Sequence, residues 1–179
     1  MPGSAPSDDL EVLIAAKHIE ARLDELARQI ERDHAGSELV LVGVLQASFI
    51  FMADLVRRLA LPLRLVFLSA SSYGDGTSPQ HPVSLRWEPL VDVGGANVLL
   101  VDTVLDTGRT LAAARAHLLE LGARRVATCV LVVKEGAQEA EVPVDYLGFT
   151  VPNRFLVGYG LDHAQRYRNL PYIAALPEG

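Results

Sequence analysis

Residues 98–111 read VLLVDTVLDTGRTL, and this stretch decides the fold. Its first four residues are apolar, a run too short for an ordinary helix, so they predict a buried strand that ends in Asp102. After a turn that contains Gly108, apolar residues recur at helical spacing from Thr110 to Leu121, and Gly122 predicts the end of this helix. The stretch therefore indicates a strand–turn–helix unit of an α/β protein, with polar residues beyond the carboxyl end of the strand.

The same alternation continues on both sides of this unit. The apolar run 39–45 predicts a buried strand, and a helix from Phe49 to about Leu59 follows it, with Ser48 in the position of a helix cap. Strands are also predicted over 63–69 and 126–133. This order is typical of a doubly wound, mainly parallel sheet in an α/β fold, with helices on both faces.

Two segments lack such regular patterns. Residues 70–82 are rich in Gly, Ser and Pro, and they predict either a simple hairpin or a flexible flap loop, with a half-exposed strand from Val83 on its far side. Residues 136–179 show no long helical pattern. They predict short strands and loops that form a small C-terminal hood, or lid, at one end of the sheet.

The length of 179 residues predicts about one domain, at roughly 150 residues per domain. Residues 1–9 predict a disordered tail, and the apolar stripe from Ile19 to Ile30 predicts an amphipathic helix. We expect a single domain over 10–179, with a core of about 37–135 and a hood made of about 136–179 plus the N-terminal segment.

The composition excludes several classes of function. Lys+Arg 16 against Asp+Glu 22 gives a formal net charge of −6, so no general basic surface is available for nucleic acid or anionic lipid. No segment approaches the roughly 18 apolar residues of a membrane span, and the N-terminus lacks the basic region of a secretion signal. Cys129 is the only cysteine and lies in an apolar run, which predicts a buried side chain without a disulfide. We expect a cytoplasmic protein that binds neither nucleic acid nor membrane.

The turn after the predicted strand carries the clearest chemistry. Thr107, Gly108 and Thr110 offer hydroxyls and unpaired N–H groups at a helix start, and Arg109 adds a cation, so the turn suits a phosphate. Because phosphate repels the nearby carboxylates of Asp102 and Asp106, these aspartates need sugar hydroxyls, Mg²⁺ or the proton of a base as partners. A phosphorylated sugar meets both requirements. The alternative is that both aspartates are ordinary strand-end and capping residues.

The stretch 98–111 resembles the phosphoribosyl-pyrophosphate-binding motif of the type I phosphoribosyltransferases. Three further stretches are similar to those of the hypoxanthine-guanine branch of this family: 42–57 (VGVLQASFIFMADLVR), 71–77 (SSYGDGT) and 145–172 (DYLGFTVPNRFLVGYGLDHAQRYRNLPY). The resemblance implies a transferase of purine salvage that joins a 6-oxopurine to phosphoribosyl pyrophosphate. The products would be IMP or GMP and pyrophosphate, and Mg²⁺ would be required.

The resemblance also implies a role for each matching residue. Asp106 would be the general acid/base near N7 of the purine, and the ribose and 5′-phosphate would be bound by Asp102, Thr103, Asp106, Thr107, Gly108, Arg109 and Thr110. The purine would be bound by Lys134, Phe155 and Leu156, the pyrophosphate by Gln46, Ala47 and Arg168, and Mg²⁺ by Asp162 and Asp102, while Ser72 and Tyr73 would close over the site.

Elementary chemistry supports two of these roles. Lys134 follows a predicted strand, and its ammonium donates hydrogen bonds only, which suits a 6-oxo group and not the 6-amino group of adenine. A planar base needs an aromatic platform, and Phe155 can supply one. The alternatives are a solvated strand-end lysine, a core phenylalanine, and an ordinary surface pair in the case of Asp162 and Arg168. The five histidines show no metal-ligand spacing, so we expect structural or exposed roles for them.

The chain departs from the family pattern at two places. Thr103 stands where the family has a second acidic residue, and Gln46 and Ala47 stand where it commonly has Lys-Gly, in a loop expected to hold a non-proline cis bond. These departures motivate one alternative function, a catalytically weak sensor of nucleotide. A regulatory RNA-binding protein of the same fold is another. The resemblance further implies a homo-oligomer, either a dimer or a tetramer.

Overall fold

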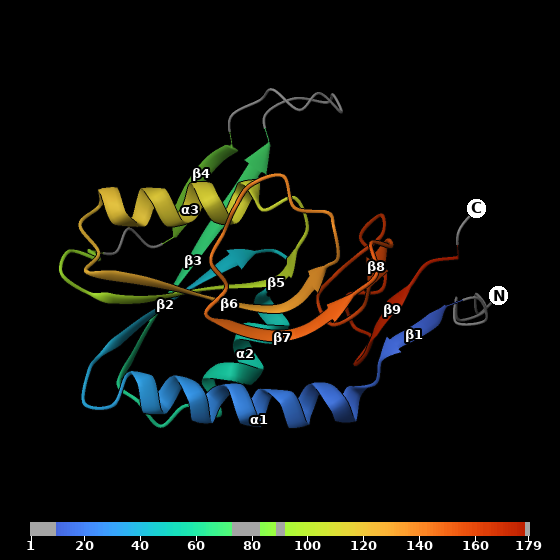
Figure 1. Cartoon of the computed structure of the whole chain (residues 1–179), viewed down its shortest axis with the longest axis horizontal. Helices are drawn as coiled ribbons and strands as arrows, with labels where there is room; N and C mark the ends of the chain where they lie inside the picture. The colour runs from blue at the N-terminus through green and yellow to red at the C-terminus, as the bar shows by residue number, and fades with distance from the viewer. Residues whose placement is uncertain (1–9, 73–82, 89–91, 178–179) are drawn as a thin grey trace.

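The large sheet has six strands in the order β4-β3-β2-β5-β6-β7 (Figure 1). The structure is a computed structural model that describes residues 10–72, 83–88 and 92–177. The elements are β1 (Glu11–Ile14), α1 (Ala16–Asp33), β2 (Leu39–Leu45), α2 (Phe49–Val56), β3 (Leu63–Ser72), β4 (Val83–Glu88), β5 (Asn97–Leu105), α3 (Arg109–Glu120), β6 (Arg125–Lys134), β7 (Tyr146–Val151), β8 (Leu156–Val157) and β9 (Ile173–Ala175).

The strand order creates a crevice between β2 and β5. Five strands are parallel, and β4 alone runs antiparallel to its neighbour β3. From β2 the chain moves outward to β3, whereas from β5 it moves in the opposite direction to β6 and β7. Ligands of doubly wound proteins bind where the order reverses in this way, beyond the carboxyl ends of the strands. The predicted doubly wound fold is confirmed.

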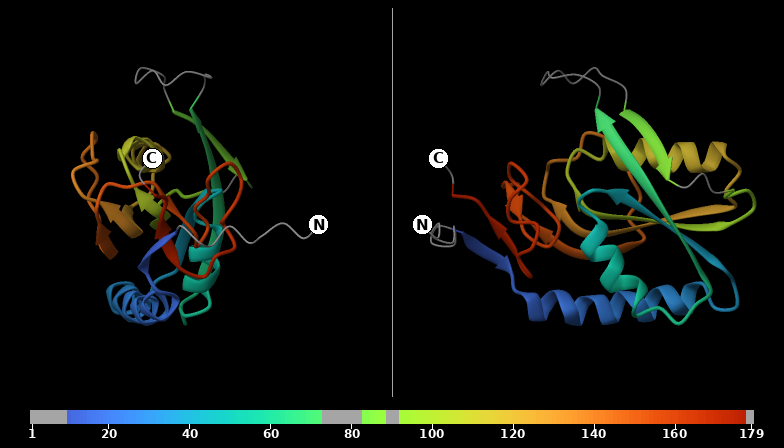
Figure 2. Two further views of the ribbon diagram at one scale, coloured as in Figure 1. Left: turned by 90° about the vertical axis from the view of Figure 1, so that its right-hand side faces the viewer. Right: turned by 180° about the vertical axis from the view of Figure 1, so that it is seen from behind.

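The two faces of the sheet are covered by different helices (Figures 1 and 2). In β5, Leu99 and Val101 belong to the core cluster that includes α1 and α2, while Val98 and Leu100 pack in the cluster with α3. This alternation follows from the two-residue period of a strand. Because the strand continues to Leu105, the side chain of Asp102 lies on the α3 face and that of the next residue on the α1–α2 face.

A second, three-stranded sheet forms the hood. β1 from the N-terminal segment pairs with β9, and β9 pairs with β8, all antiparallel. Figure 1 shows these strands together at the end of the large sheet where β6 and β7 terminate. The sheet combines strands from both ends of the described chain.

Several predicted boundaries need correction. β7 pairs with β6 in the large sheet, so the core continues beyond the predicted limit near 135 to Val151. It is an edge strand, buried only at Tyr146 and Val151 and partly or fully exposed between them, so it lacks the continuous apolar pattern of a central strand. β3 extends to Ser72, so the loop expected from residue 70 begins later, in a hairpin with β4. The tail 1–9 and most of the expected flap, Tyr73 included, lie outside the described residues.

The predicted cap at Ser48 is wrong. Helix α2 begins at Phe49 and already ends at Val56, and Ser48 makes no side-chain cap. Its buried hydroxyl instead donates a hydrogen bond to the carbonyl of Val44 at 2.6 Å. The backbone of Ser48 is helical and not extended, so its hydroxyl points back to the preceding turn and not forward to the helix amides.

The buried position predicted for the only cysteine is confirmed. Cys129 is fully buried, and burial raises the pKa of its thiol. No group of three or more His, Cys, Asp or Glu side chains there has the arrangement of a metal site. His34 is buried, and burial lowers its pKa. Of the helices described, none combines the length and the apolar character needed to cross a bilayer.

Candidate active site

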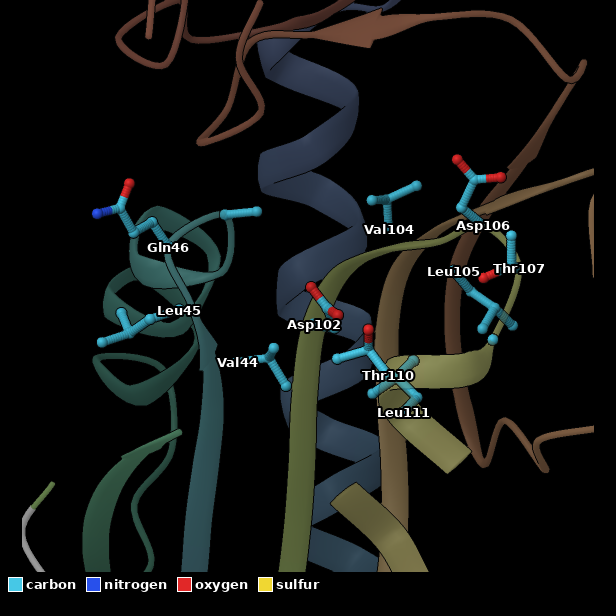
Figure 3. Close-up of a pocket in the computed structure, with 12 residues that line it drawn as sticks. Val44, Leu45, Gln46, Asp102, Val104, Leu105, Asp106, Thr107, Thr110 and Leu111 are labelled. Carbon is cyan, nitrogen blue, oxygen red and sulfur yellow. The ribbon is translucent and has the colours of Figure 1, made fainter. Parts of the chain in front are cut away.

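A cavity of ≈ 270 Å³ lies in the crevice between the carboxyl ends of β2 and β5 (Figure 3). Its walls come from three places in the sequence: the end of β2 with the following loop, the end of β5, and the start of α3. The lining residues are Val44, Leu45, Gln46, Ala47, Asp102, Val104, Leu105, Asp106, Thr107, Gly108, Thr110 and Leu111.

The turn into α3 presents hydrogen-bond donors to this cavity. Gly108 adopts a positive φ of 82°, and a Cβ there would lie 2.7 Å from the carbonyl oxygen of Ala140, so only glycine fits. The carbonyl of Thr107 accepts hydrogen bonds from the amides of Glu139 and Ala140 at 2.9 and 3.0 Å. With this carbonyl held by the neighbouring loop, the unpaired N–H groups of the helix start and the hydroxyls of Thr107 and Thr110 are left for an anion.

Asp102 places a buried carboxyl group on the opposite wall of the cavity (Figure 3). Burial raises its pKa to about 7, although the amides of Thr103 and Val104 act in the other direction. The Thr103 amide donates to Oδ1 of Asp102 at 2.7 Å. No cationic side chain among the described residues pairs with this carboxyl group, so sugar hydroxyls or a cation would satisfy it on binding.

This raised pKa predicts how the stability of the free protein depends on pH. Between about pH 4 and 7 the folded state keeps the Asp102 proton that the unfolded state loses, so the free energy of unfolding contributed by this group falls as pH rises. Asp102→Asn removes that fall. Urea unfolding without Mg²⁺ should therefore show the variant gaining stability relative to the parent from about pH 5 to about pH 8, by at most about 1.4 kcal/mol per pH unit. A constant difference across this range would contradict the prediction.

A second cavity, of ≈ 180 Å³, adjoins the first and shares Val104 and Asp106 with it. The remaining walls come from the end of β6 and from the hood. The lining residues are Val104, Asp106, Lys134, Phe155, Leu156, Leu161 and Asp162. Asp106 therefore stands on the boundary between the two cavities.

The side chains of the second cavity suit a flat, polar-edged ring. Lys134 is only 9% exposed, and its Nζ lies 2.7 Å from Oδ2 of Asp106, so it is not a solvated surface lysine. Phe155 is 53% exposed, so it is not a core residue. Its ring packs edge-on against His163, with ring centroids 5.4 Å apart. An exposed aromatic face beside a buried ammonium can stack a planar heterocycle and donate to an acceptor on its edge.

The hood brings a second charged pair to the edge of the site. Asp162 Oδ1 lies 2.7 Å from Nη2 of Arg168, and Asp162 Oδ2 accepts from the amide of Gln165 at 2.9 Å. Arg168 also donates to the carbonyl of Gly160 at 2.7 Å and to Oε1 of Gln46 at 3.2 Å. The pair is thus tied into the hood and to the loop after β2, and it is more than an isolated surface ion pair.

Three of the predicted residues, Thr103, Arg109 and Arg168, do not line either cavity. Thr103 is fully buried on the α1–α2 face of β5, where its hydroxyl donates to the carbonyl of Ala47 at 2.9 Å. The guanidinium of Arg109 pairs with Glu139. Strand alternation turns the Thr103 side chain away from Asp102, and the Arg109 side chain lies beside an acidic loop that is 30 residues distant in sequence.

The Thr103 hydroxyl should stabilise the fold by holding the loop after β2. Removing one member of a buried hydrogen bond leaves the Ala47 carbonyl unsatisfied, so Thr103→Val should lower the free energy of unfolding by roughly 1–3 kcal/mol. Thr128→Val is the matched control, since Thr128 is equally buried on β6 and its hydroxyl has no hydrogen-bond partner within the described chain. Equal losses in the two variants, measured by urea unfolding, would contradict this reading.

Sequence reasoning missed several residues that shape the site. Val104 and Leu161 supply apolar walls of the second cavity, and each adjoins a predicted site residue, so proximity in sequence was an available signal. Glu139 and Ala140, which orient the turn into α3, follow Lys134 in an irregular loop and carry no local signal. The expected cis bond is present at Leu45–Gln46.

Comparisons with known proteins agree with this geometry. Residues 11–164 match the family model described as phosphoribosyl transferase domain. A hypoxanthine phosphoribosyltransferase of Salmonella typhimurium is 44% identical over 166 residues, which cover 92% of this chain and 93% of the relative. A hypoxanthine-guanine phosphoribosyltransferase of Dictyostelium discoideum is 43% identical over 94% of this chain and 96% of its own length. The solved structure of a Staphylococcus aureus hypoxanthine phosphoribosyltransferase superposes with a TM-score of 0.91 at 33% identity, covering 99% of this chain and 97% of that one.

Proposed function

The chain belongs to the phosphoribosyl transferase domain family, and from this premise we propose that it transfers the 5-phosphoribosyl group from phosphoribosyl pyrophosphate to hypoxanthine or guanine. The products are IMP or GMP and pyrophosphate, so the protein is a pentosyltransferase of purine salvage. One observation carries the proposal: Asp106 lies on the wall shared by a cavity suited to a phosphorylated sugar and a cavity suited to a flat base. The glycosidic bond that forms joins the sugar in the first cavity to the base in the second.

The base is held in the second cavity. Lys134 donates to O6 of the purine, a contact that adenine cannot accept because its 6-amino group is itself a donor. The exposed ring of Phe155 stacks on the base, and the backbone of Leu156 contacts its edge. Asp106 faces N7 and takes or returns its proton as the glycosidic bond forms or breaks.

The sugar phosphate is held in the first cavity. The N–H groups and hydroxyls from Asp106 to Thr110 surround the 5′-phosphate at the start of α3. Asp102 accepts hydrogen bonds from the ribose hydroxyls. In the free protein below about pH 7 its buried carboxyl group carries a proton, and the hydrogen bonds from the hydroxyls take the place of that proton.

The leaving group is pyrophosphate, on which negative charge grows as the anomeric carbon becomes cationic. Arg168 grips it by hydrogen bonds, and the loop at Gln46 and Ala47 lies beside it at the edge of the first cavity. For this step Arg168 must separate from Asp162.

The carboxylates present fit a hard cation. Asp102 is buried without a cationic side-chain partner among the described residues, and Asp162 lies at the rim of the second cavity. Two carboxylates alone do not complete the coordination shell of a metal ion. They suit Mg²⁺, because this ion keeps waters and substrate oxygens as its other ligands. When bound, Mg²⁺ offsets charge on the departing pyrophosphate.

The proposal extends to the protein's organisation. One domain over 10–179, a dimer or tetramer, and a cytoplasmic location complete it. Phe49 and Leu65 are 44% and 45% exposed, and such apolar side chains are available for a subunit contact. Light scattering of the purified protein tests the oligomer.

A pyrophosphate-release assay with phosphoribosyl pyrophosphate and Mg²⁺ tests the function. We expect turnover with hypoxanthine and guanine, a far lower rate with adenine and none with uracil, with xanthine as a further substrate to compare. Absence of turnover with every 6-oxopurine would reject the proposal. Tight calorimetric binding of nucleotide without turnover would favour the sensor, and a salt-dependent RNA shift would favour the RNA-binding alternative.

A further inference from the structure

The loop after β2 carries no cation, although it borders the first cavity. Gln46 is exposed there, and its amide extends away from the cavity floor toward the hood (Figure 3). Its Oε1 accepts a hydrogen bond from Nη2 of Arg168 at 3.2 Å, across 122 residues of sequence. Gln46 therefore contacts the one guanidinium that the proposed function assigns to the leaving group.

The other contacts of this guanidinium come from the hood itself. Arg168 donates to the Gly160 carbonyl at 2.7 Å and to Gln165 at 3.4 Å, and it pairs with Asp162 at 2.7 Å. Within the described chain, Gln46 is thus the only side chain from the large sheet and its loops that contacts it. Gln46, which lines the first cavity, therefore links Arg168 to the wall of that cavity.

The backbone next to Gln46 fixes its distance from the hood. A Cβ on Gly160, whose φ is +96°, would lie 2.1 Å from the carbonyl oxygen of Ala47, so the hood backbone packs directly on the loop. The same carbonyl accepts the Thr103 hydroxyl at 2.9 Å from β5. Loop, strand and hood meet at Ala47, which fixes the backbone from which the Gln46 side chain extends to Arg168.

The charges around Arg168 explain why a neutral acceptor is suited to this position. Asp162 neutralises the guanidinium in the free protein, and it can no longer do so once it binds a cation. Gln46 Oε1, Gln165 Oε1 and the Gly160 carbonyl then remain, and they orient the guanidinium without cancelling its charge.

We propose that Gln46 is a positioning residue that holds Arg168 toward the leaving pyrophosphate, and so replaces a cation in the loop by orienting one in the hood. The inference rests on the proposed function. It assigns Gln46 an action through Arg168 and not through direct contact with substrate.

Gln46→Met tests the inference, because methionine has nearly the same length and lacks the acceptor. We expect the KM for pyrophosphate, measured with IMP in the reverse reaction, to rise roughly tenfold, as for the loss of one hydrogen bond to a charged group. The KM for phosphoribosyl pyrophosphate should rise with it, while the KM for hypoxanthine stays unchanged. Gln29→Met, the same substitution at the far end of α1, controls for the change itself.

A double-mutant cycle with Arg168→Met separates the two modes of action. If Gln46 acts through Arg168, Gln46→Met should have no further effect on pyrophosphate affinity once Arg168 is removed. Additive effects, or an unchanged KM for pyrophosphate in the single variant, would overturn the inference. If the parent protein shows no turnover, the proposed function fails by itself, and calorimetric titration of the same four proteins with Mg²⁺-pyrophosphate still decides the role of Gln46.

Discussion

Asp106→Asn should lower kcat with hypoxanthine by roughly 10²-fold or more, as expected when a general acid/base is removed. Asparagine keeps the size and one acceptor oxygen of aspartate, but it cannot take up a proton from N7. The side chain is half exposed and lies at the junction of the two cavities, so the substitution changes neither the core nor the shape of either cavity. The loss should fall on kcat more than on either KM.

The effect on the neighbouring lysine must be separated from the effect on proton transfer. Asp106→Asn also removes the charge 2.7 Å from Lys134, and a weakened contact to the base would appear as a higher KM for hypoxanthine. Asp145→Asn is the matched control, since Asp145 pairs with Arg125 and the Thr128 amide and lines neither cavity. Near-normal kcat in Asp106→Asn would remove Asp106 from the acid/base role.

Lys134→Met should lower kcat/KM for hypoxanthine by roughly 10- to 100-fold, the range for one hydrogen bond from a charged donor. Methionine fills most of the volume of the lysine stem at this buried position, so packing changes little. What is lost is the ammonium group that meets O6 and that pairs with Asp106 in the free protein.

Selectivity between bases distinguishes a contact to the base from a general loss of activity. Since adenine gains nothing from Lys134, its low rate should be unaffected, and the ratio of hypoxanthine to adenine activity should fall. Lys17→Met, on the exposed side of α1, is the matched lysine control. An unchanged ratio of activities would mean that Lys134 does not discriminate between the substituents at the 6-position of the purine.

The candidate site was largely visible in the sequence because its residues follow strands. Asp102, Asp106 and Lys134 come at or after the ends of apolar runs, and the carboxyl ends of parallel strands meet at one edge of a sheet. Composition and spacing alone favoured a phosphorylated sugar in the turn into α3. The identity of the base rested on the family resemblance, because a lysine and a phenylalanine in separate segments have no spacing that identifies a ligand.

The role of Thr103 shows the limit of such reasoning. In the sequence, Thr103 directly follows Asp102, and its neutral side chain implies one negative charge fewer in the sugar site. In the fold, the strand turns it to the opposite face, where it holds Ala47 and contributes to the joint between loop and hood. Residues adjacent in sequence therefore lie in different environments. The departure from the family pattern at 103 is structurally linked to the departure at 46 and 47.

The sequence by itself determined the order of the central strands and helices, the parallel sheet and a turn whose donors suit a phosphate. These features depend on the periodicity of apolar residues and on local backbone chemistry, which act over a few residues. Only the tertiary structure decided that β7 joins the large sheet, that Arg109 pairs with Glu139, and that Gln46 contacts Arg168. Each of these depends on the register and docking of segments far apart in the chain, which no local pattern encodes.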